Sequence, residues 1–356
     1  MFRILGTTVC LTFLVLSSGC AHSRRTIRPI DTMSLEDRAL ECLKRGIQYK
    51  PNAVVRTEAI EALRSYGSAD SLPWIRTALM DEHPAVRFAA CMAIGEMEDA
   101  KSQAMLLKCA TDKDVSVRVA ALFALHRIGT TERTGLLVGH LLDDEDPTVR
   151  RNAALALGLM KEPGAIKILA RAMKDEDIGV RNHALEAMGR LGNPESRQQL
   201  VFLANSGVGS EEVFAINALA ELQEKIYYDI FLYKLDSASH LETKLAAARG
   251  LGLLGMTEGF AVALDAIDFN RPVPRDNLDT PADQILRTRQ LAAAALGAIG
   301  EPAALPELNK SMISNEDARL QVSAAKAILE ILAHDHTGDV LFATPAGQAG
   351  SQAKVR

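Results

Sequence analysis

The chain has 356 residues, of which 48% are hydrophobic and 4% aromatic, and a formal net charge of −5 at pH 7. A nucleic-acid groove usually needs an excess of basic residues, so this composition disfavours nucleic acid as a partner. With so few aromatic residues the core must be aliphatic and rich in alanine. The length is compatible with one large helical domain.

Residues 1–19 have the features of a signal peptide: Arg3 gives a basic start, and residues 4–16 are apolar but too few to span a membrane as a mature helix. The sequence LSSGC, which ends at Cys20, resembles the bacterial lipobox, with Ser17 where leucine is more common. The resemblance implies cleavage before Cys20 and lipidation of its thiol. An ordinary secretory signal with an incidental cysteine is the alternative.

Residues 20–33 are then a lipidated tether, since several acyl chains hold a protein durably at a bilayer. Ala21 follows the cysteine where aspartate commonly signals retention in an inner membrane. We therefore expect an exported protein anchored to the outer membrane and facing the periplasm. The structured chain is predicted to begin at Ser34, where the sequence has a capping-box pattern.

A repeat of about 31 residues runs through residues 34–333. Three columns define it, and the first is mostly arginine: Arg56, Arg87, Arg118, Arg150, Arg181, Glu212, Lys244, Arg289 and Gln321. The second is alanine throughout: Ala59, Ala90, Ala121, Ala153, Ala184, Ala215, Ala247, Ala292 and Ala324. The third is small: Ala62, Ala93, Ala124, Ala156, Ala187, Ala218, Gly250, Ala295 and Ala327.

Each repeat is predicted to be a pair of antiparallel helices. In residues 144–158, apolar side chains recur at helical spacing, and Asp146-Pro147 provides an N-cap followed by proline at the first helical position. Gly95, Gly129, Gly158 and Gly192 are the predicted stop signals. Since one pair cannot bury its apolar face alone, stacked pairs must share a continuous core. The predicted fold is an all-α, right-handed α-solenoid of about nine helix pairs.

The pattern Val-Arg-x-x-Ala-x-x-Ala-Leu-Gly, with an aspartate upstream, resembles HEAT repeats of the type found in phycobilisome lyases and deoxyhypusine hydroxylase. The resemblance covers roughly residues 34–333 and is strongest over 84–192. It is specific for the fold and says little about function.

The recurring arginines and aspartates have two interpretations. They either line a groove for acidic partners or pair across repeats as a structural ladder, and we favour the ladder because both types recur together. Its members are Arg87, Arg118, Arg150, Arg181, Asp81, Asp112, Asp144 and Asp175. Cys42, Cys91 and Cys109 are expected to be buried thiols, with a bridge between the last two left open.

The pattern becomes irregular after Gly192. Residues 226–233 are rich in aromatic side chains, which we interpret as a bulky helix face, with a docking patch as the alternative. An insertion at 268–279 falls between the helices of the eighth repeat and offers a second candidate contact. The candidate contacts from these two segments are Tyr227, Tyr228, Phe231, Tyr233, Arg271 and Arg275. Residues 334–356 lose the repeat and are predicted to be a mobile tail.

The second helix of each pair is expected to line the concave surface, as in solenoids of this type. Apolar side chains then face solvent in repeats two to four, bordered by charged residues, which is typical of a peptide-binding site. Burial by curvature or by a second copy is the alternative. The candidate partner-binding residues are Phe88, Met92, Val119, Phe123, His126, Arg151 and Leu155.

No catalytic or metal-ligand set can be placed by spacing, and we expect no cofactor. Deoxyhypusine hydroxylase, in the resembling group, binds iron through His-Glu pairs; here His183 and Glu186 are the nearest approach, without a counterpart in another repeat. We therefore expect a lipid-anchored envelope scaffold or adaptor that binds a protein or peptide. The alternative is a divergent HEAT-fold enzyme, hydroxylase-like or lyase-like, or an enzyme-assembly factor. The sequence does not indicate an oligomeric state.

Overall fold

The computed structural model describes residues 34–272, 280–314 and 316–341, with side chains up to His334. The predicted signal peptide, Cys20, the tether and Arg275 lie outside the described residues. Helices are the regular secondary structure of the described chain, and they form nine antiparallel pairs, as predicted. None of its helices is both long enough and apolar enough to cross a membrane.

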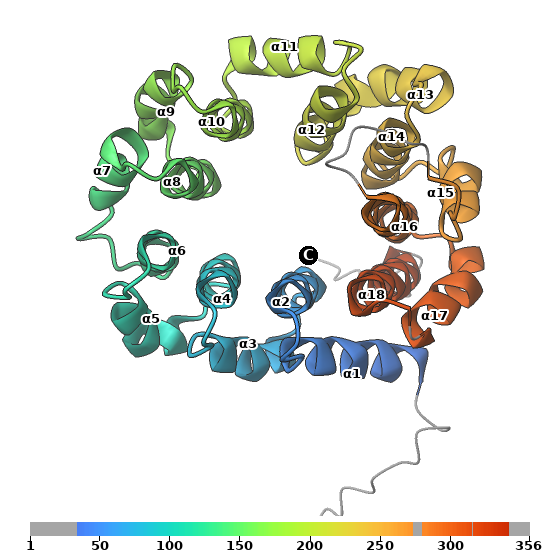
Figure 1. The fold of residues 1–356 in the computed structure, drawn as a ribbon, viewed down its shortest axis with the longest axis horizontal. Coiled ribbons are helices and arrows are strands. Elements are labelled where there is room, and N and C mark those ends of the chain that lie inside the picture. The colour runs from blue at the N-terminus through green and yellow to red at the C-terminus, as the bar shows by residue number, and fades with distance from the viewer. Residues whose placement is uncertain (1–33, 273–279, 315, 342–356) are drawn as a thin grey trace, which may run out of the picture. The chain divides into compact units, whose positions relative to one another are not determined.

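The pairs form two concentric layers (Figure 1). The outer layer holds the first helix of each pair: α1 (Leu35–Ile47), α3 (Leu72–Ala78), α5 (Gln103–Cys109), α7 (Leu136–Asp143), α9 (Ile166–Ala172), α11 (Pro194–Leu203), α13 (Tyr228–Ser237), α15 (Phe260–Ala266) and α17 (Leu305–Ile313). The inner layer holds the second: α2 (Ala53–Tyr66), α4 (Pro84–Glu96), α6 (Val115–Arg127), α8 (Pro147–Leu159), α10 (Ile178–Arg190), α12 (Gly209–Ala220), α14 (Leu241–Leu253), α16 (Pro281–Ile299) and α18 (Ala318–Leu341).

The helices begin where the local sequence predicts. The Asp146 side chain accepts a hydrogen bond from the backbone N–H of Thr148 at 2.7 Å, which caps α8. Ser34 caps α1 in the same way, and Thr280 caps α16. The last helix, α18, is described as far as Leu341.

The alanine columns lie at contacts between helices: Ala59 faces Gly46 of the outer helix α1, whereas Ala124 and Ala187 of the second small column face Gly95 and Gly158 of the preceding inner helix. Every member of the all-alanine column, from Ala59 to Ala324, is fully buried, and the second small column is buried as well. A side chain of one methyl group lets neighbouring helices approach closely, and stacking then buries the apolar stripe of each pair.

The predicted stop glycines have two different roles. Gly129 and Gly192 follow their helices with φ of +90° and +87°, a conformation that glycine adopts readily. Gly95 and Gly158 are not stops, because α4 and α8 continue past them. A Cβ atom on Gly95 would lie 2.7 Å from the Cα of Ala124, and one on Gly158 would lie 2.6 Å from the Cβ of Ala187, so neither position has room for a side chain.

The inner helices close into a ring, which the sequence did not predict. The last helix, α18, packs against both α1 and α2 of the first repeat. Val322 of α18 lies beside Gly46, where a Cβ atom would come within 3.1 Å of the valine methyl group. The Gln290 amide donates to the Glu58 carboxylate at 3.2 Å across the same junction. We call this contact of first and last repeats the closure.

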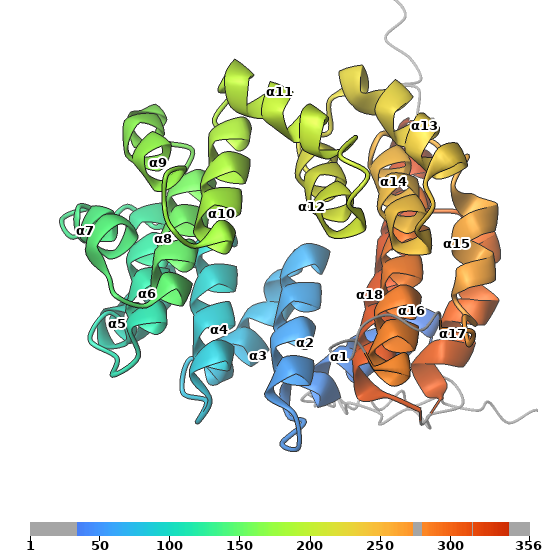
Figure 2. The ribbon, with the colours of Figure 1, turned by 45° about the horizontal axis from the view of Figure 1, so that its top comes forward.

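The ring has one discontinuity in its inner layer. Each inner helix of the described chain packs directly on the next, except that α10 and α12 make almost no contact. The outer helix α11 packs on both and bridges them (Figure 2). We call this interval between α10 and α12 the break.

Candidate functional site

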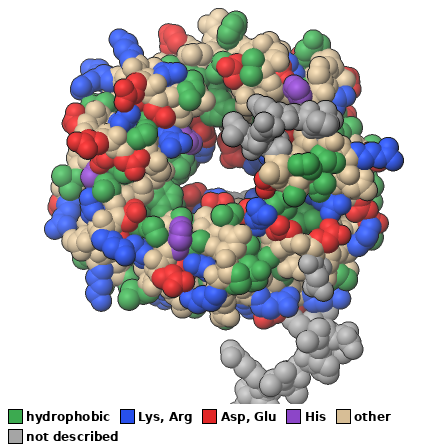
Figure 3. All heavy atoms as spheres, in the orientation of Figure 1, with side chains coloured by type: hydrophobic (Ala, Val, Ile, Leu, Met, Phe, Trp, Pro, Cys, Tyr) green, Lys and Arg blue, Asp and Glu red, His purple; other side chains and the backbone are tan. Residues whose placement is uncertain are grey.

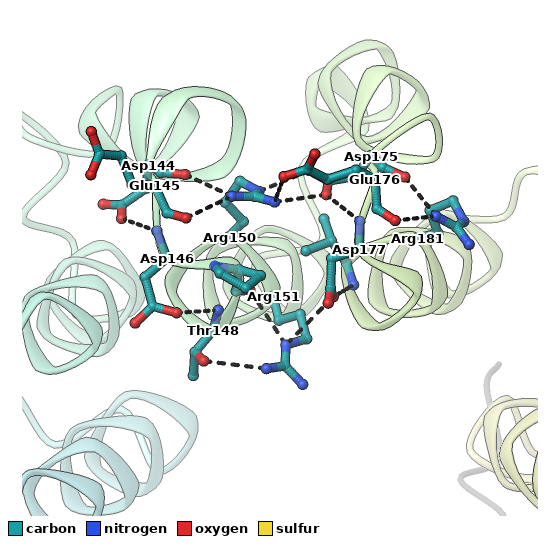
Figure 4. A network of polar contacts seen from close by, with 12 residues as sticks. Asp144, Glu145, Asp146, Thr148, Arg150, Arg151, Asp175, Glu176, Asp177 and Arg181 are labelled. Atoms are coloured by element: carbon teal, nitrogen blue, oxygen red, sulfur yellow. Dashed lines mark hydrogen bonds and ion pairs between the residues drawn. The ribbon is translucent and has the colours of Figure 1, made fainter.

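An arginine–aspartate ladder holds the regular repeats together (Figure 4). Arg150 donates through Nε and Nη2 to both carboxylate oxygens of Asp175 in the next repeat, each at 2.9 Å. Its Nη1 donates to the carbonyl oxygens of Asp144 and Glu145 in its own turn. Bidentate charge-assisted bonds fix the orientation of both partners, so each rung sets the angle between consecutive repeats.

The same rung forms between Arg87 and Asp112, and Arg56 contacts Asp81 through one nitrogen at 2.9 Å. The Arg150 guanidinium holds the pKa of Asp175 below its ordinary value, chiefly through these hydrogen bonds. The ladder residues are thus engaged inside the protein, in keeping with a structural role.

Two ladder arginines lack a carboxylate from the next repeat among the described residues. Arg118 donates to carbonyl oxygens of its own turn, because Asp144 contacts His140 at 3.3 Å instead. Arg181 also bonds its own turn, and the following repeat offers Asn205 and Ser206 where the aspartate would be. The missing rung at Arg181 coincides with the break.

The next rung has inverted charges. Glu212 occupies the arginine column and pairs with Lys234 of α13 at 2.6 Å, with both side chains buried. Thr243 donates to the other oxygen of Glu212 at 3.4 Å. After the break, the arginine column is therefore occupied by a glutamate that forms a buried ion pair with a lysine, so this junction differs chemically from the arginine–aspartate rungs.

The inner layer encloses a central cavity of about 500 Å³, open in the space-filling view (Figure 3). Its lining comes from α2, α4, α8, α10 and α12, so it lies at the centre of the ring and continues into the break. The lining residues are Glu61, Arg64, Phe88, Ala89, Met92, Glu96, Leu155, Leu159, Glu186, Arg190, Phe214, Asn217, Ala218 and Glu221. We call this the central cavity.

The structure brings three of the predicted partner-binding residues together in this cavity. Phe88 and Met92 lie on α4, and Leu155 lies on α8. Phe214, from α12, adds an aromatic ring from beyond the break. An apolar wall with charged residues around it has the composition of a peptide-binding cavity.

The expectation that Val119 and Phe123 face solvent is wrong, since both are fully buried, and Met92 at the edge of the cavity is only 7% exposed. The Phe123 ring packs on Gly95, where a Cβ atom would lie 2.8 Å from the ring. The glycine thus accepts the aromatic side chain between α4 and α6. Helical periodicity placed these residues on the concave side, but the close approach of the two helices covers them.

His126 and Arg151 do not line the cavity either. His126 contacts Thr134 at 3.2 Å and Glu162 at 3.4 Å. Arg151 lies over the start of α10, with its Cδ 2.6 Å from the position of a Cβ on Gly179 and its Nε 3.9 Å from Asp177. Both side chains are engaged locally.

A smaller hollow of about 170 Å³ adjoins the central cavity at the closure. It is lined by Glu58, Glu61, Gln290, Ala294, Val322, Ser323, Lys326 and Glu330. Glu61 belongs to both hollows. We call this the closure pocket, and it exists because α18 returns to α2.

Of the other candidate contacts, Tyr227 and Phe231 are buried and are therefore excluded as contacts; Phe231 packs against Gly250. Tyr233 is exposed, and Tyr228 is half-buried and donates to Glu258 at 2.9 Å. Arg271 is exposed at the start of the insertion. The aromatic segment is thus mainly the predicted bulky helix face.

The three cysteines of the solenoid, Cys42, Cys91 and Cys109, are buried free thiols. The described residues contain no group of three or more His, Cys, Asp or Glu side chains arranged to hold a metal ion. His183 lies 3.7 Å from Glu186 on α10. Burial alone would raise the pKa of Glu186, but contacts with His183 and Arg190 bring it below its ordinary value.

Several cavity residues escaped the sequence analysis. Phe214, Leu159 and Arg190 line the central cavity but are not among the predicted contacts. Glu58 faces inward because α18 packs beside α2. These residues could be recognised only by predicting the closure and the break, and the local sequence indicates neither of them directly.

The geometry defines the chain as a helical-repeat ring with an internal cavity. Family models for HEAT repeats match residues 37–126 and 135–220, and a model for the PBS lyase HEAT-like repeat matches residues 288–313. Together these matches cover more than half of the chain. The chain therefore belongs to the HEAT-repeat proteins.

Curated relatives share parts of the solenoid. A HEAT repeat-containing taxis protein of Halobacterium salinarum is 32% identical over 51% of this chain and 38% of its own length. The bilin biosynthesis protein PecE of Mastigocladus laminosus is 36% identical over 30% of this chain and 39% of its own. Deoxyhypusine hydroxylase of Drosophila pseudoobscura pseudoobscura is 33% identical over 24% of this chain and 28% of its own. The chain thus spans well under half the length of each.

Two solved structures resemble the fold. The complex of CpcE and CpcF of phycocyanin lyase from Nostoc matches 70% of this chain and 97% of the matched chain, with a TM-score of 0.42 and 19% identity. Human deoxyhypusine hydroxylase matches 86% of this chain and 100% of its own, with a TM-score of 0.38 and 19% identity.

Proposed function

We propose that this protein binds a segment of a partner polypeptide in its central cavity and acts as a scaffold or adaptor. One observation carries the proposal: the central cavity has an apolar wall bordered by charged side chains, and this wall is formed by Phe88, Met92, Leu155 and Phe214. The volume of about 500 Å³ suits a few side chains of a partner. Apolar surface in such a cavity is stabilised when a partner covers it.

The proposal includes an anchor. A lipidated Cys20 would hold the ring at a bacterial membrane, and the tether 20–33 would present it to the periplasm. The test is mass spectrometry of the amino-terminal peptide from the membrane fraction. Diacylglyceryl-modified Cys20 supports the anchor, and an unmodified cysteine or an uncleaved leader contradicts it.

Affinity purification from detergent-solubilised membranes tests the cavity. We expect the wild-type chain to retain a partner that the double variant Phe88→Glu, Phe214→Glu loses, because two carboxylates make the apolar wall unfavourable. Phe202→Glu is the matched control, since Phe202 is 72% exposed on the outer helix α11. Circular dichroism establishes that each variant is folded. A partner retained by the double variant would exclude the central cavity.

A second candidate function is participation in an enzyme reaction, either as an assembly factor or as a divergent enzyme. The relatives named as bilin biosynthesis protein and deoxyhypusine hydroxylase favour this form of the proposal. The same purification distinguishes the two forms. An enzyme, or the protein that it modifies, recovered with the wild-type ring supports the assembly role. Stoichiometric iron in protein purified without added metal would instead support a hydroxylase-like activity.

A further inference from the structure

Four basic side chains of the inner helices are already paired. Each contacts a glutamate of the same or a neighbouring inner helix: Arg64 with Glu96 at 2.7 Å, Arg190 with Glu186 at 2.8 Å, Arg249 with Glu221 at 2.6 Å, and Lys326 with Glu330 at 3.6 Å. Pairing within the wall leaves none of these four cations without a counterion.

Two glutamates of α2 differ from the rest. Within the described chain, no basic nitrogen lies within 4 Å of the carboxylates of Glu58 or Glu61. Glu58 accepts hydrogen bonds from the neutral Gln290 amide, which also donates to Ser323. The nearby Arg319 is engaged with Asp317 at 2.8 Å. The closure pocket thus has two carboxylates in excess of its cations.

Their surroundings make these charges costly. Burial, together with the neighbouring charge of Glu61, raises the pKa of Glu58 to about 7, against the opposing effects of Gln290 and Arg319. The Glu61 side chain is exposed to the cavity, and the protein packed around it still raises its pKa, although the charges of Arg64 and Lys326 lower it in part. A cation supplied from outside would offset this cost.

The position of Glu61 links charge to apolar surface. It lines the central cavity together with Phe88 and Met92 of the adjacent helix α4, and it lines the closure pocket together with Glu58. A ligand in the cavity can therefore contact the apolar wall and reach the carboxylates at the same time. An acidic segment would instead meet uncompensated negative charge.

We infer that the segment bound in the central cavity is a basic, apolar peptide that directs a lysine or arginine toward Glu58 and Glu61 while its neighbouring apolar side chain packs on Phe88. This inference rests on the proposed function and names the chemistry of its partner. Charge complementarity supplies the specificity, and the apolar contact supplies most of the buried area.

The test uses a phage-displayed library of random 12-residue peptides, selected against the full chain in detergent micelles. We expect the selected peptides to combine lysine or arginine with neighbouring apolar residues. Replacing that lysine by norleucine, which keeps the alkyl chain and removes the charge, should weaken binding about tenfold, as measured by fluorescence anisotropy.

In the protein variant Glu58→Gln, Glu61→Gln, the same replacement in the peptide should weaken binding by less than about threefold, because the two carboxylates are absent. Glu132→Gln, on an exposed connection, is the control and should keep the tenfold difference. The inference would be overturned if the norleucine replacement weakened binding equally in all three proteins, or if the selected peptides had no basic residues. Either result would leave the proposed binding cavity itself in place. A library that yields no peptide sensitive to Phe88→Glu, Phe214→Glu would overturn the proposed function itself.

Discussion

The closure and the break are opposite exceptions to the same stacking rule. At the closure, Glu58 and Gln290 are 232 positions apart in sequence and yet in hydrogen-bond contact. At the break, α10 and α12 are consecutive inner helices and hardly touch. Proximity along the chain therefore does not decide which inner helices pack; the residues on the facing surfaces do.

The facing surfaces at the break show the reason. One position near the end of the inner helix is glycine in five repeats: Gly95, Gly158, Gly189, Gly252 and Gly297. A Cβ on Gly158 would lie 2.6 Å from the Cβ of Ala187 on the next inner helix. At Gly189 the nearest atom instead belongs to Leu200 of α11, and Arg197 donates to the Gly189 carbonyl at 2.9 Å. Side chains of α11 thus occupy the surface that an inner helix covers elsewhere.

The comparison has a functional consequence. The closure creates the closure pocket, and residues from both sides of the break, Arg190 of α10 and Phe214 of α12, line the central cavity. Both departures from regular stacking therefore shape the proposed site.

The largest effect is expected from disrupting the closure with Val322→Asp. Val322 is 3% exposed, and an unpaired carboxylate there should lower the free energy of unfolding by about 3–5 kcal/mol. Urea unfolding followed by circular dichroism measures the loss, and small-angle scattering should show a larger radius of gyration as the ring opens. Val54→Asp, at a 50% exposed position of α2, is the control and should change stability little. Wild-type stability for Val322→Asp would show that the closure is dispensable.

The next effect compares ladder arginines on either side of the missing rung. Arg150→Gln removes a bidentate pair with Asp175 and two bonds to backbone carbonyls, so it should cost about 3 kcal/mol. Arg181→Gln removes bonds to its own turn and should cost about 1 kcal/mol. Urea midpoints measured side by side check the difference. Equal losses of stability in the two variants would mean that the Arg150–Asp175 contact between repeats contributes little to the free energy of unfolding.

A smaller effect is expected from alanine at equivalent glycines. Gly158→Ala should destabilise by about 2 kcal/mol, because the new methyl group meets Ala187 of α10. Gly189→Ala meets the end of the flexible Leu200 side chain, so the higher helix propensity of alanine should leave it neutral or stabilised by up to about 1 kcal/mol. Thermal unfolding of both variants provides the measurement. A loss at Gly189 as large as that at Gly158 would argue against an open break in solution.

The smallest effect concerns the charge at the closure. Because the pKa of Glu58 is raised to about 7 in the folded chain, its contribution to stability is present below the unfolded value and is lost as pH rises through 7. Glu58→Gln removes this pH-dependent loss and keeps an acceptor for Gln290. We expect its Tm to exceed that of wild type by about 1–2 °C at pH 8 and to match it near pH 4. A variant that is less stable than wild type at pH 8 would show that the charged form of Glu58 supports the closure.

The helix pairs could be predicted because their determinants are local. Caps such as Asp146 and Thr280 act on backbone groups two or three residues away, and the buried alanine columns follow from helical periodicity. The ladder followed from the recurrence of arginine and aspartate at a fixed spacing. These features concern one repeat or two neighbouring repeats, and a periodic sequence specifies them directly.

The candidate site was predicted only in part. Phe88, Met92 and Leu155 do line the cavity, whereas Val119 and Phe123 are buried against Gly95 and the neighbouring helix. Periodicity gives the direction of a side chain relative to its own helix. It does not give the distance to the next helix, which decides whether that side chain meets water or protein.

The sequence by itself determined a HEAT-repeat α-solenoid, because each repeat encodes its own pair and its contact with the next. Tertiary structure alone decided that the array closes on itself and separates between α10 and α12. Small differences in angle between repeats accumulate along a solenoid, and their sum brings α18 back to α2. That sum, rather than any single motif, places Glu58 beside Gln290 and assembles the cavity in which a partner would bind.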